Sequence, residues 1–198
     1  YNFMSDAERE QVLQFVKDFA KPGEILIAGT NAPHTKGVIA NTKRAKEIGY
    51  DAVLLATPFY TKPTQAELIK HFNTVLDAVD INIVLYSYPG KDGVELEWEA
   101  LDALADHPRV IGIKESSGSL QRAIGIATRY KDKLQLVSGS DDIALDFMLW
   151  GADSWICGPS NCMAKACCDL DRTFRAGDIK KAKEQMATLY TAMNILES

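Results

Sequence analysis

The chain has 198 residues, of which 46% are hydrophobic and 25% are charged, and its formal net charge is −5. This composition indicates a globular chain with one sizeable core, and it excludes collagen-like, disordered and disulfide-rich secreted proteins. The charge is spread along the sequence without a basic cluster, so we expect neither nucleic acid nor an anionic membrane surface as a partner.

No targeting or metal-binding pattern is present in the sequence. No apolar run approaches the roughly 20 residues that a bilayer span needs, and no segment reads as a signal peptide, so we expect a cytoplasmic protein. The cysteines are not spaced like zinc pairs, and we expect buried thiols and no metal site. They are Cys157, Cys162, Cys167 and Cys168.

The chain opens at Tyr1 without an initiator Met, and we expect a segment to precede it. The run Ser5-Asp6-Ala7-Glu8 has the pattern of a capping box, in which a Ser and a Glu three residues later bond to each other's backbone amides. It predicts a helix that continues to about Phe19.

Beyond this helix, short runs of Val, Ile and Leu alternate with amphipathic stretches, as in repeated βα units around a buried parallel sheet. The expected strands are Glu24–Ala28, Ala52–Ala56, Asn82–Tyr86, Val110–Lys114, Leu134–Val137 and Ser154–Cys157. The expected helices lie at about Thr35–Ile48, Thr64–Ala78, Glu97–Ala105, Ser119–Tyr130, Asp141–Trp150, Asn161–Phe174 and Asp178–Leu196.

This alternation predicts an α/β fold, a (β/α)₈ TIM barrel from which two βα units are missing. An open doubly wound sheet is the alternative, but no glycine fingerprint follows a first strand. Polar segments follow the expected strands, at the end of a barrel that carries the active site. They include Thr57-Pro58-Phe59-Tyr60, Tyr86-Ser87-Tyr88-Pro89, Lys114-Glu115-Ser116-Ser117-Gly118 and Ser138-Gly139-Ser140-Asp141.

Lys114 is the most informative of these residues because it ends a strand that should be buried. Burial lowers the pKa of a lysine, and a neutral amine can attack a ketone carbonyl. The alternative is a lysine at the rim that forms a salt bridge with Glu115 or another carboxylate. Placement alone leaves both interpretations open.

Two tyrosines and a glycine could act with Lys114. Tyr86 ends another strand at the same edge, where its phenol could exchange protons with an imine; the alternative is a tyrosine of the core. Tyr60 could be a proton relay, an interface residue or both. Gly139 would let the backbone approach a ligand closely.

With these motifs, the chain resembles the dihydrodipicolinate synthase and N-acetylneuraminate lyase family, class I Schiff-base enzymes on a (β/α)₈ barrel. The segment Gly112-Ile113-Lys114-Glu115-Ser116-Ser117-Gly118 is similar to the lysine signature of the family, and Leu85-Tyr86-Ser87-Tyr88-Pro89 is similar to its tyrosine motif. The segments that end in Tyr60 and Asp141 match the loops after the fourth and seventh strands.

The resemblance implies that Lys114 forms an imine with the keto carbon of pyruvate or another 2-keto acid, and that Tyr86 shuttles the proton. Tyr60 would extend the hydroxyl relay, and the backbone at Gly139 and Ile156 would line the substrate. The imine is the electron sink, so no further cofactor is expected. A homo-oligomer, tetramer or dimer, is usual in the family.

The sequence departs from the family pattern in two places. Lys91 stands where the synthases typically carry an Arg that clamps a second carboxylate of the substrate, and Lys is a poor bidentate substitute. The family's Gly-Thr-Thr-Gly-Glu loop, strands 1 and 2 and the last C-terminal helices are absent. We therefore expect residues 1–177 to form a partial barrel, about strands 3 to 8, and residues 178–198 to begin a helical extension.

The leading hypothesis is a lysine-dependent lyase or aldolase that acts on a 2-keto acid and is similar to dihydrodipicolinate synthase. One alternative keeps the Schiff base but ends in dehydration, as in 2-keto-3-deoxy sugar-acid dehydratases. An alternative of another class is a non-catalytic binding or assembly module that retains the barrel surface.

Overall fold

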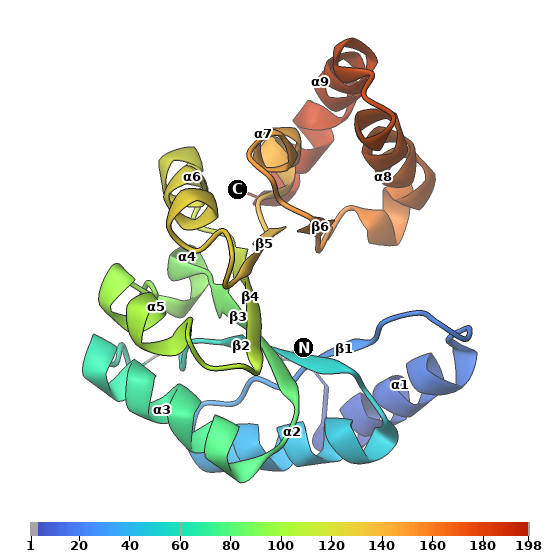
Figure 1. The fold of residues 1–198 in the computed structure, drawn as a ribbon. Coiled ribbons are helices and arrows are strands. Elements are labelled where there is room, and N and C mark those ends of the chain that lie inside the picture. The colour runs from blue at the N-terminus through green and yellow to red at the C-terminus, as the bar shows by residue number, and fades with distance from the viewer. Residues whose placement is uncertain (1–3, 60, 198) are drawn as a thin grey trace. The chain divides into compact units, whose positions relative to one another are not determined.

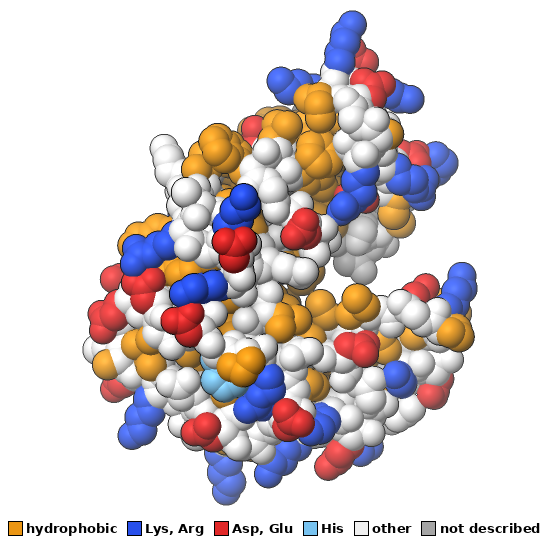
Figure 2. Space-filling view, in the orientation of Figure 1, with side chains coloured by type: hydrophobic (Ala, Val, Ile, Leu, Met, Phe, Trp, Pro, Cys, Tyr) orange, Lys and Arg blue, Asp and Glu red, His pale blue; other side chains and the backbone are white. Residues whose placement is uncertain are grey.

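The computed structural model describes residues 4–59 and 61–197, in which helices and strands alternate along the chain (Figure 1). The chain divides into two compact units, an N-terminal unit that ends at Ile111 and a C-terminal unit that begins at Gly112. None of the helices in the described ranges combines the length and the apolar character that a membrane span needs. Acidic and basic side chains are intermixed on the face shown in Figure 2.

The N-terminal unit is built from three parallel strands and their helices. Strand β1 pairs with β2 from Ile27 opposite Ala52, and β2 pairs with β3, with Val53 opposite Ile83. Helices α2 and α3 lie on the same side of β1 and β2 (Figure 1). The elements are α1 (Asp6–Phe19), β1 (Ile27–Gly29), α2 (Thr35–Ile48), β2 (Ala52–Ala56), α3 (Gln65–Ala78), β3 (Asn82–Ser87), α4 (Pro89–Asp92) and α5 (Trp98–Leu104).

The core of this unit follows from the apolar runs of its strands. Leu55 of β2 and Ile83 of β3 are fully buried, and so are Leu68 and Phe72 on the inner face of α3. A parallel strand is covered on both faces, which is why its sequence is apolar almost throughout. The predicted alternation of strands and helices is therefore confirmed here.

Local capping signals set the helix starts. Ser5 and Glu8 form the predicted capping box at the start of α1, and Thr64 and Glu67 form another at the start of α3. Gly49 ends α2 with a φ of 97°, a left-handed conformation that glycine adopts without steric cost.

The C-terminal unit repeats the strand and helix pattern. Strands β4 and β5 pair in parallel, with Ile113 opposite Leu136, and β5 pairs with β6, with Ser138 opposite Trp155. A hydrophobic cluster that includes Leu170 and Met193 joins the last two helices. The elements are β4 (Val110–Glu115, which starts in the N-terminal unit), α6 (Leu120–Arg129), β5 (Gln135–Ser138), η1 (Asp141–Ile143), α7 (Ala144–Leu149), β6 (Ser154–Trp155), α8 (Ser160–Arg175) and α9 (Ile179–Glu197).

Several predicted elements differ from the observed ones by one residue at an end, and three differ by more. The first strand spans Ile27–Gly29 rather than Glu24–Ala28, because Ile25 is 77% exposed and pairing with β2 starts only at Ile27. The last strand stops at Trp155, and the helix expected from Asp141 begins as a 3₁₀ turn.

Helix α4 was not predicted at all. It forms where Pro89 occupies the first turn and Gly93 ends the helix with a φ of 77°. Pro is favoured at the first helical position because its fixed φ suits a helix and its missing N–H is not needed there. The predicted division of the chain after residue 177 stays a prediction.

Candidate active site

Lys114 lies near the end of β4 and is half-buried, as the sequence indicated. Burial lowers the pKa of its amine, while the negative charges of Asp141, Glu197 and Cys157 act in the opposite direction. Because desolvation is the largest of these effects, the environment favours the neutral amine. A neutral amine with a lone pair is the form that can add to a carbonyl carbon.

Glu115, the suggested salt-bridge partner of a rim lysine, has its own buried partners. Its side chain is 0% exposed, and its Oε2 accepts a hydrogen bond of 2.8 Å from Nε of Arg122, which is 8% exposed. Its Oε1 accepts from the backbone N–H of Ser117 at 2.6 Å. Consecutive side chains of a strand point to opposite faces, so this ion pair lies on the face away from Lys114.

Gly139 brings the backbone of the loop after β5 against the end of β4. Its N–H donates to the carbonyl of Glu115 at 3.0 Å, and the hydroxyl of Ser116 donates to the Gly139 carbonyl at 2.8 Å. A Cβ at this position would lie 2.8 Å from Cε of Lys114 and 2.8 Å from the carbonyl oxygen of Glu115. Only glycine fits against these neighbours, and the predicted close approach of this backbone to a ligand stays a prediction.

Asp141 supplies a carboxylate next to this lysine. Its Oδ1 accepts from Nε1 of Trp155 at 2.8 Å, and its backbone N–H donates to Oε1 of Glu197 at 2.8 Å. Burial raises the pKa of Asp141, and its hydrogen bonds and the charge of Lys114 lower it. Sequence reasoning did not identify Asp141 or Glu197 as neighbours of Lys114.

Ile156 follows β6 and is half-buried. Its N–H donates to the carbonyl of Ser138 at 3.1 Å, which continues the pairing of β5 and β6 by one residue. Its predicted contact with a substrate stays a prediction.

Tyr86 belongs to the N-terminal unit, where it lies in β3 and is half-buried. Its ring centroid is 5.9 Å from that of Tyr88. Nearby in the same unit, the hydroxyl of Thr57 donates to Oδ2 of Asp92 at 3.1 Å. Burial raises the pKa of Asp92 to about 6, and the bond from Thr57 lowers it.

The remaining predicted residues are less informative. Lys91 lies in α4 and is exposed. Tyr60 lies outside the described residues. The structure thus groups Lys114, Gly139 and Asp141 in the C-terminal unit, and the pairing of Tyr86 with Lys114 stays a prediction.

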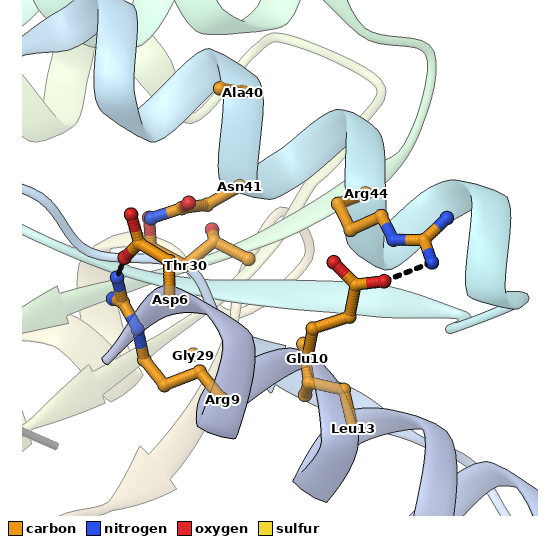
Figure 3. A pocket seen from close by; sticks show the side chains of 9 residues that line it. All are labelled: Asp6, Arg9, Glu10, Leu13, Gly29, Thr30, Ala40, Asn41 and Arg44. Carbon is orange, nitrogen blue, oxygen red and sulfur yellow. Dashed lines mark hydrogen bonds and ion pairs between the residues drawn. The ribbon is translucent and has the colours of Figure 1, made fainter. Parts of the chain in front are cut away.

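A cavity of about 280 Å³ opens in the N-terminal unit among α1, β1 and α2 (Figure 3). Arg44 pairs with Glu10, and Arg9 pairs with Asp6. These charges neutralise one another, and the cavity contains none of the predicted site residues. It is therefore not part of the predicted site.

The comparisons with known proteins all indicate the same family. The model of the dihydrodipicolinate synthetase family matches residues 1–198. The 4-hydroxy-tetrahydrodipicolinate synthase of Trichlorobacter lovleyi is 41% identical over 181 residues, which are 91% of this chain and 62% of that protein. The enzyme of the same name from Geobacter sulfurreducens is 39% identical over 176 residues, 89% of this chain and 61% of that protein. The chain thus spans less than two thirds of the length of either relative.

Solved structures show the same likeness. The dihydrodipicolinate synthase of Acinetobacter baumannii, complexed with pyruvate, matches with a TM-score of 0.93 and 35% identity, over 98% of this chain and 67% of that chain. The enzyme of Aquifex aeolicus matches with a TM-score of 0.91 and 31% identity, over the same shares of both chains. The predicted fold class, an incomplete (β/α)₈ barrel, is therefore confirmed.

Proposed function

This chain belongs to the dihydrodipicolinate synthetase family, and on that premise we propose that it is a lysine-dependent lyase of the class I aldolase type. We propose pyruvate or another 2-keto acid as its substrate. The observation that carries the proposal is the half-buried amine of Lys114, whose pKa is lowered by burial and which the backbone of Gly139 approaches closely. Burial thus makes this amine better suited to nucleophilic attack than an exposed lysine.

The chemistry follows from an imine on Lys114. The neutral amine adds to the keto carbon, and loss of water from the carbinolamine gives a protonated imine. A carbon–carbon bond next to this imine can then form or break through an enamine, because the imine nitrogen accepts the electron pair. No cofactor besides this covalent imine is proposed.

Most of the other residues receive their roles from the family resemblance, and Asp141 receives its role from its interaction with Lys114. Tyr86 would donate a proton to the leaving hydroxyl and take one back, and Tyr60 would extend that relay. The backbone at Gly139 and Ile156 would line the bound acid. Asp141 would stabilise the positive charge of the imine, since its carboxylate already interacts electrostatically with Lys114.

The names of the relatives favour an aldolase over a dehydratase or a non-catalytic module. The Acinetobacter baumannii structure contains pyruvate, which supports a 2-keto acid as substrate. Lys91 cannot make the bidentate contact of an Arg with a second carboxylate, so the proposal names the keto acid alone. A homo-oligomer, tetramer or dimer, is proposed from the family resemblance, and light scattering after size-exclusion chromatography tests it.

Reductive trapping tests the proposed reaction. The protein is incubated with pyruvate and sodium borohydride, digested and analysed by mass spectrometry. We expect one reduced pyruvate adduct on Lys114, no adduct in Lys114→Ala, and full labelling in Lys131→Ala, an exposed lysine of the same unit. A wild-type protein that stays unlabelled, or that is labelled at another lysine, contradicts the proposal.

A further inference from the structure

Two cysteines of the C-terminal unit face each other. Cys157 follows β6, Cys167 lies in α8, and their Sγ atoms are 3.5 Å apart. All four cysteines of the chain are free thiols. Cys162 and Cys168 are exposed, and Sγ of Cys162 donates to the carbonyl of Pro159 at 3.3 Å. The close pair is therefore distinct from the two thiols at the surface.

A small oxidant can reach this pair through a cavity of about 390 Å³ in the same unit. Cys157, Cys167 and the exposed Cys168 all line it, and Cys157 is half-buried whereas Cys167 is 4% exposed. Cys157 is thus the more exposed residue of the close pair. The lining residues are Trp155, Cys157, Ser160, Cys167, Cys168, Asp171, Arg172 and Arg175.

The chain between the two cysteines can supply the movement that a disulfide needs. The S–S bond is about 2.05 Å long, so the sulfur atoms, now 3.5 Å apart, must approach by about 1.5 Å. Helix α8 is interrupted at Met163, whose φ of −127° and ψ of 35° are not helical. The break lies between Cys157 and Cys167, so the first turn can shift without moving the rest of the helix.

We propose that Cys157 and Cys167 are an oxidative modification site and form a reversible intrachain disulfide. With hydrogen peroxide as oxidant, the Cys157 thiol loses its proton, the thiolate attacks one peroxide oxygen and the O–O bond breaks, which gives a sulfenic acid and a hydroxide that takes up the released proton as water. Sγ of Cys167 then attacks the sulfenic sulfur, the S–O bond breaks, and a second water leaves with the proton of Cys167. A dithiol reductant restores both thiols.

The site adjoins the polar groups around Lys114, because the Cys157 thiol also hydrogen-bonds to the side chain of Asp141. Burial raises the pKa of both thiols, so the reactive thiolate is scarce at neutral pH. Oxidation is therefore expected to be slow and to accelerate as the pH rises.

Peptide mapping tests the proposal. Trypsin cleaves after Lys133, Lys165 and Arg172, which places Cys157 and Cys162 in one peptide and Cys167 and Cys168 in the next. A Cys162→Ser/Cys168→Ser variant keeps only the close pair. The matched control is Cys157→Ser/Cys167→Ser, which keeps only the exposed pair. Each protein is treated with hydrogen peroxide, alkylated with iodoacetamide, digested and analysed without reduction.

In the first variant we expect the two peptides to be joined, lighter than their reduced sum by two hydrogen atoms, and separated again by dithiothreitol. The control is expected to give separate peptides. Unlinked peptides in the first variant, a link only between molecules, or an equal link in the control would each overturn the proposal. Wild-type protein, digested at the same time, shows whether the link also forms with all four thiols present.

Discussion

The two units hold the polar side chains near their strand ends in different ways. In the C-terminal unit, the turn after β4 is fixed by the buried ion pair of Glu115 and Arg122 and by the bond from Ser116 to Gly139. In the N-terminal unit, Tyr86 has an aromatic neighbour, Tyr88, at the end of β3. Buried charges are costly to leave unpaired, so they define one geometry more strictly than an aromatic contact does. The turn that follows Lys114 is therefore held by a buried ion pair.

The outer helices differ in a similar way. Helix α9 buries Ala182, Met186 and Met193, whereas α1 has no buried residue and its Phe15 and Phe19 are 67% and 76% exposed. The capping box gives α1 local support that does not depend on burial. Burial of apolar side chains thus stabilises α9, whereas local capping stabilises α1.

Breaking the ion pair should have the largest effect on stability. Arg122→Ala leaves the carboxylate of Glu115 buried without its charge partner, and we expect a loss of about 3–5 kcal/mol in the free energy of unfolding. Urea denaturation measures it. The control is Arg172→Ala, which removes an exposed ion pair with Asp169 and should cost no more than about 1 kcal/mol.

A neutral replacement of the whole pair sharpens this result. Glu115→Gln with Arg122→Met removes both charges and retains most of the volume, so it should cost less than Arg122→Ala alone. Equal losses in the two variants would show that packing, rather than an unpaired charge, dominates at this site.

In the N-terminal unit, a buried histidine should make the stability depend on pH. Burial lowers the pKa of His71 to about 4, and its Nδ1 lies 2.8 Å from Oγ1 of Thr35. The unfolded chain binds the proton more tightly, so stability is full above about pH 6.5 and is lost as the pH falls toward 4. The loss is at most about 3 kcal/mol.

His71→Phe should remove this dependence, because a phenyl ring has no proton to gain. The measurement is urea denaturation on both sides of the window. If the variant and the wild-type protein lose the same stability on acidification, other groups are responsible.

Tyr86→Phe tests whether the residue of the N-terminal unit acts on the chemistry proposed for Lys114. If the phenol is the proton donor and acceptor, kcat should fall by about 10²-fold or more while borohydride trapping at Lys114 persists. Tyr88→Phe, which changes the neighbouring ring in the same way, should leave kcat within a few-fold. Equal losses in the two variants would assign Tyr86 to packing.

The strands could be predicted because buried parallel strands are apolar runs, and β2 was predicted to the residue. Lys114 and Gly139 could be identified because a polar or small residue after such a run is conspicuous. Glu197 could not, since its bond to Asp141 joins residues 56 apart in sequence. No local sequence pattern indicates a contact between residues so far apart in the chain.

The thiol pair escaped prediction for a related reason. Cys157 and Cys167 are ten residues apart, and their meeting depends on how the chain turns from β6 into α8. Their spacing in the sequence indicated only that they do not form a zinc-binding motif. The turn at Lys91 was missed because Pro89 and Gly90 favour a loop as well as a helical turn.

The smallest expected effects come from the N-cap residues of two helices, one in each unit. Thr64 caps α3 and Ser119 caps α6, where it accepts from the N–H of Arg122 at 3.2 Å. Thr64→Ala and Ser119→Ala should each cost about 1 kcal/mol in the free energy of unfolding, measured by urea denaturation.

The two caps should differ, however, when each is combined with Arg122→Ala. Because Ser119 fixes the backbone of Arg122 itself, its effect should depend on whether the ion pair is intact, whereas Thr64→Ala should add to Arg122→Ala within about 0.5 kcal/mol. A coupling near zero for Ser119 as well would mean that the ion pair holds its geometry without the cap.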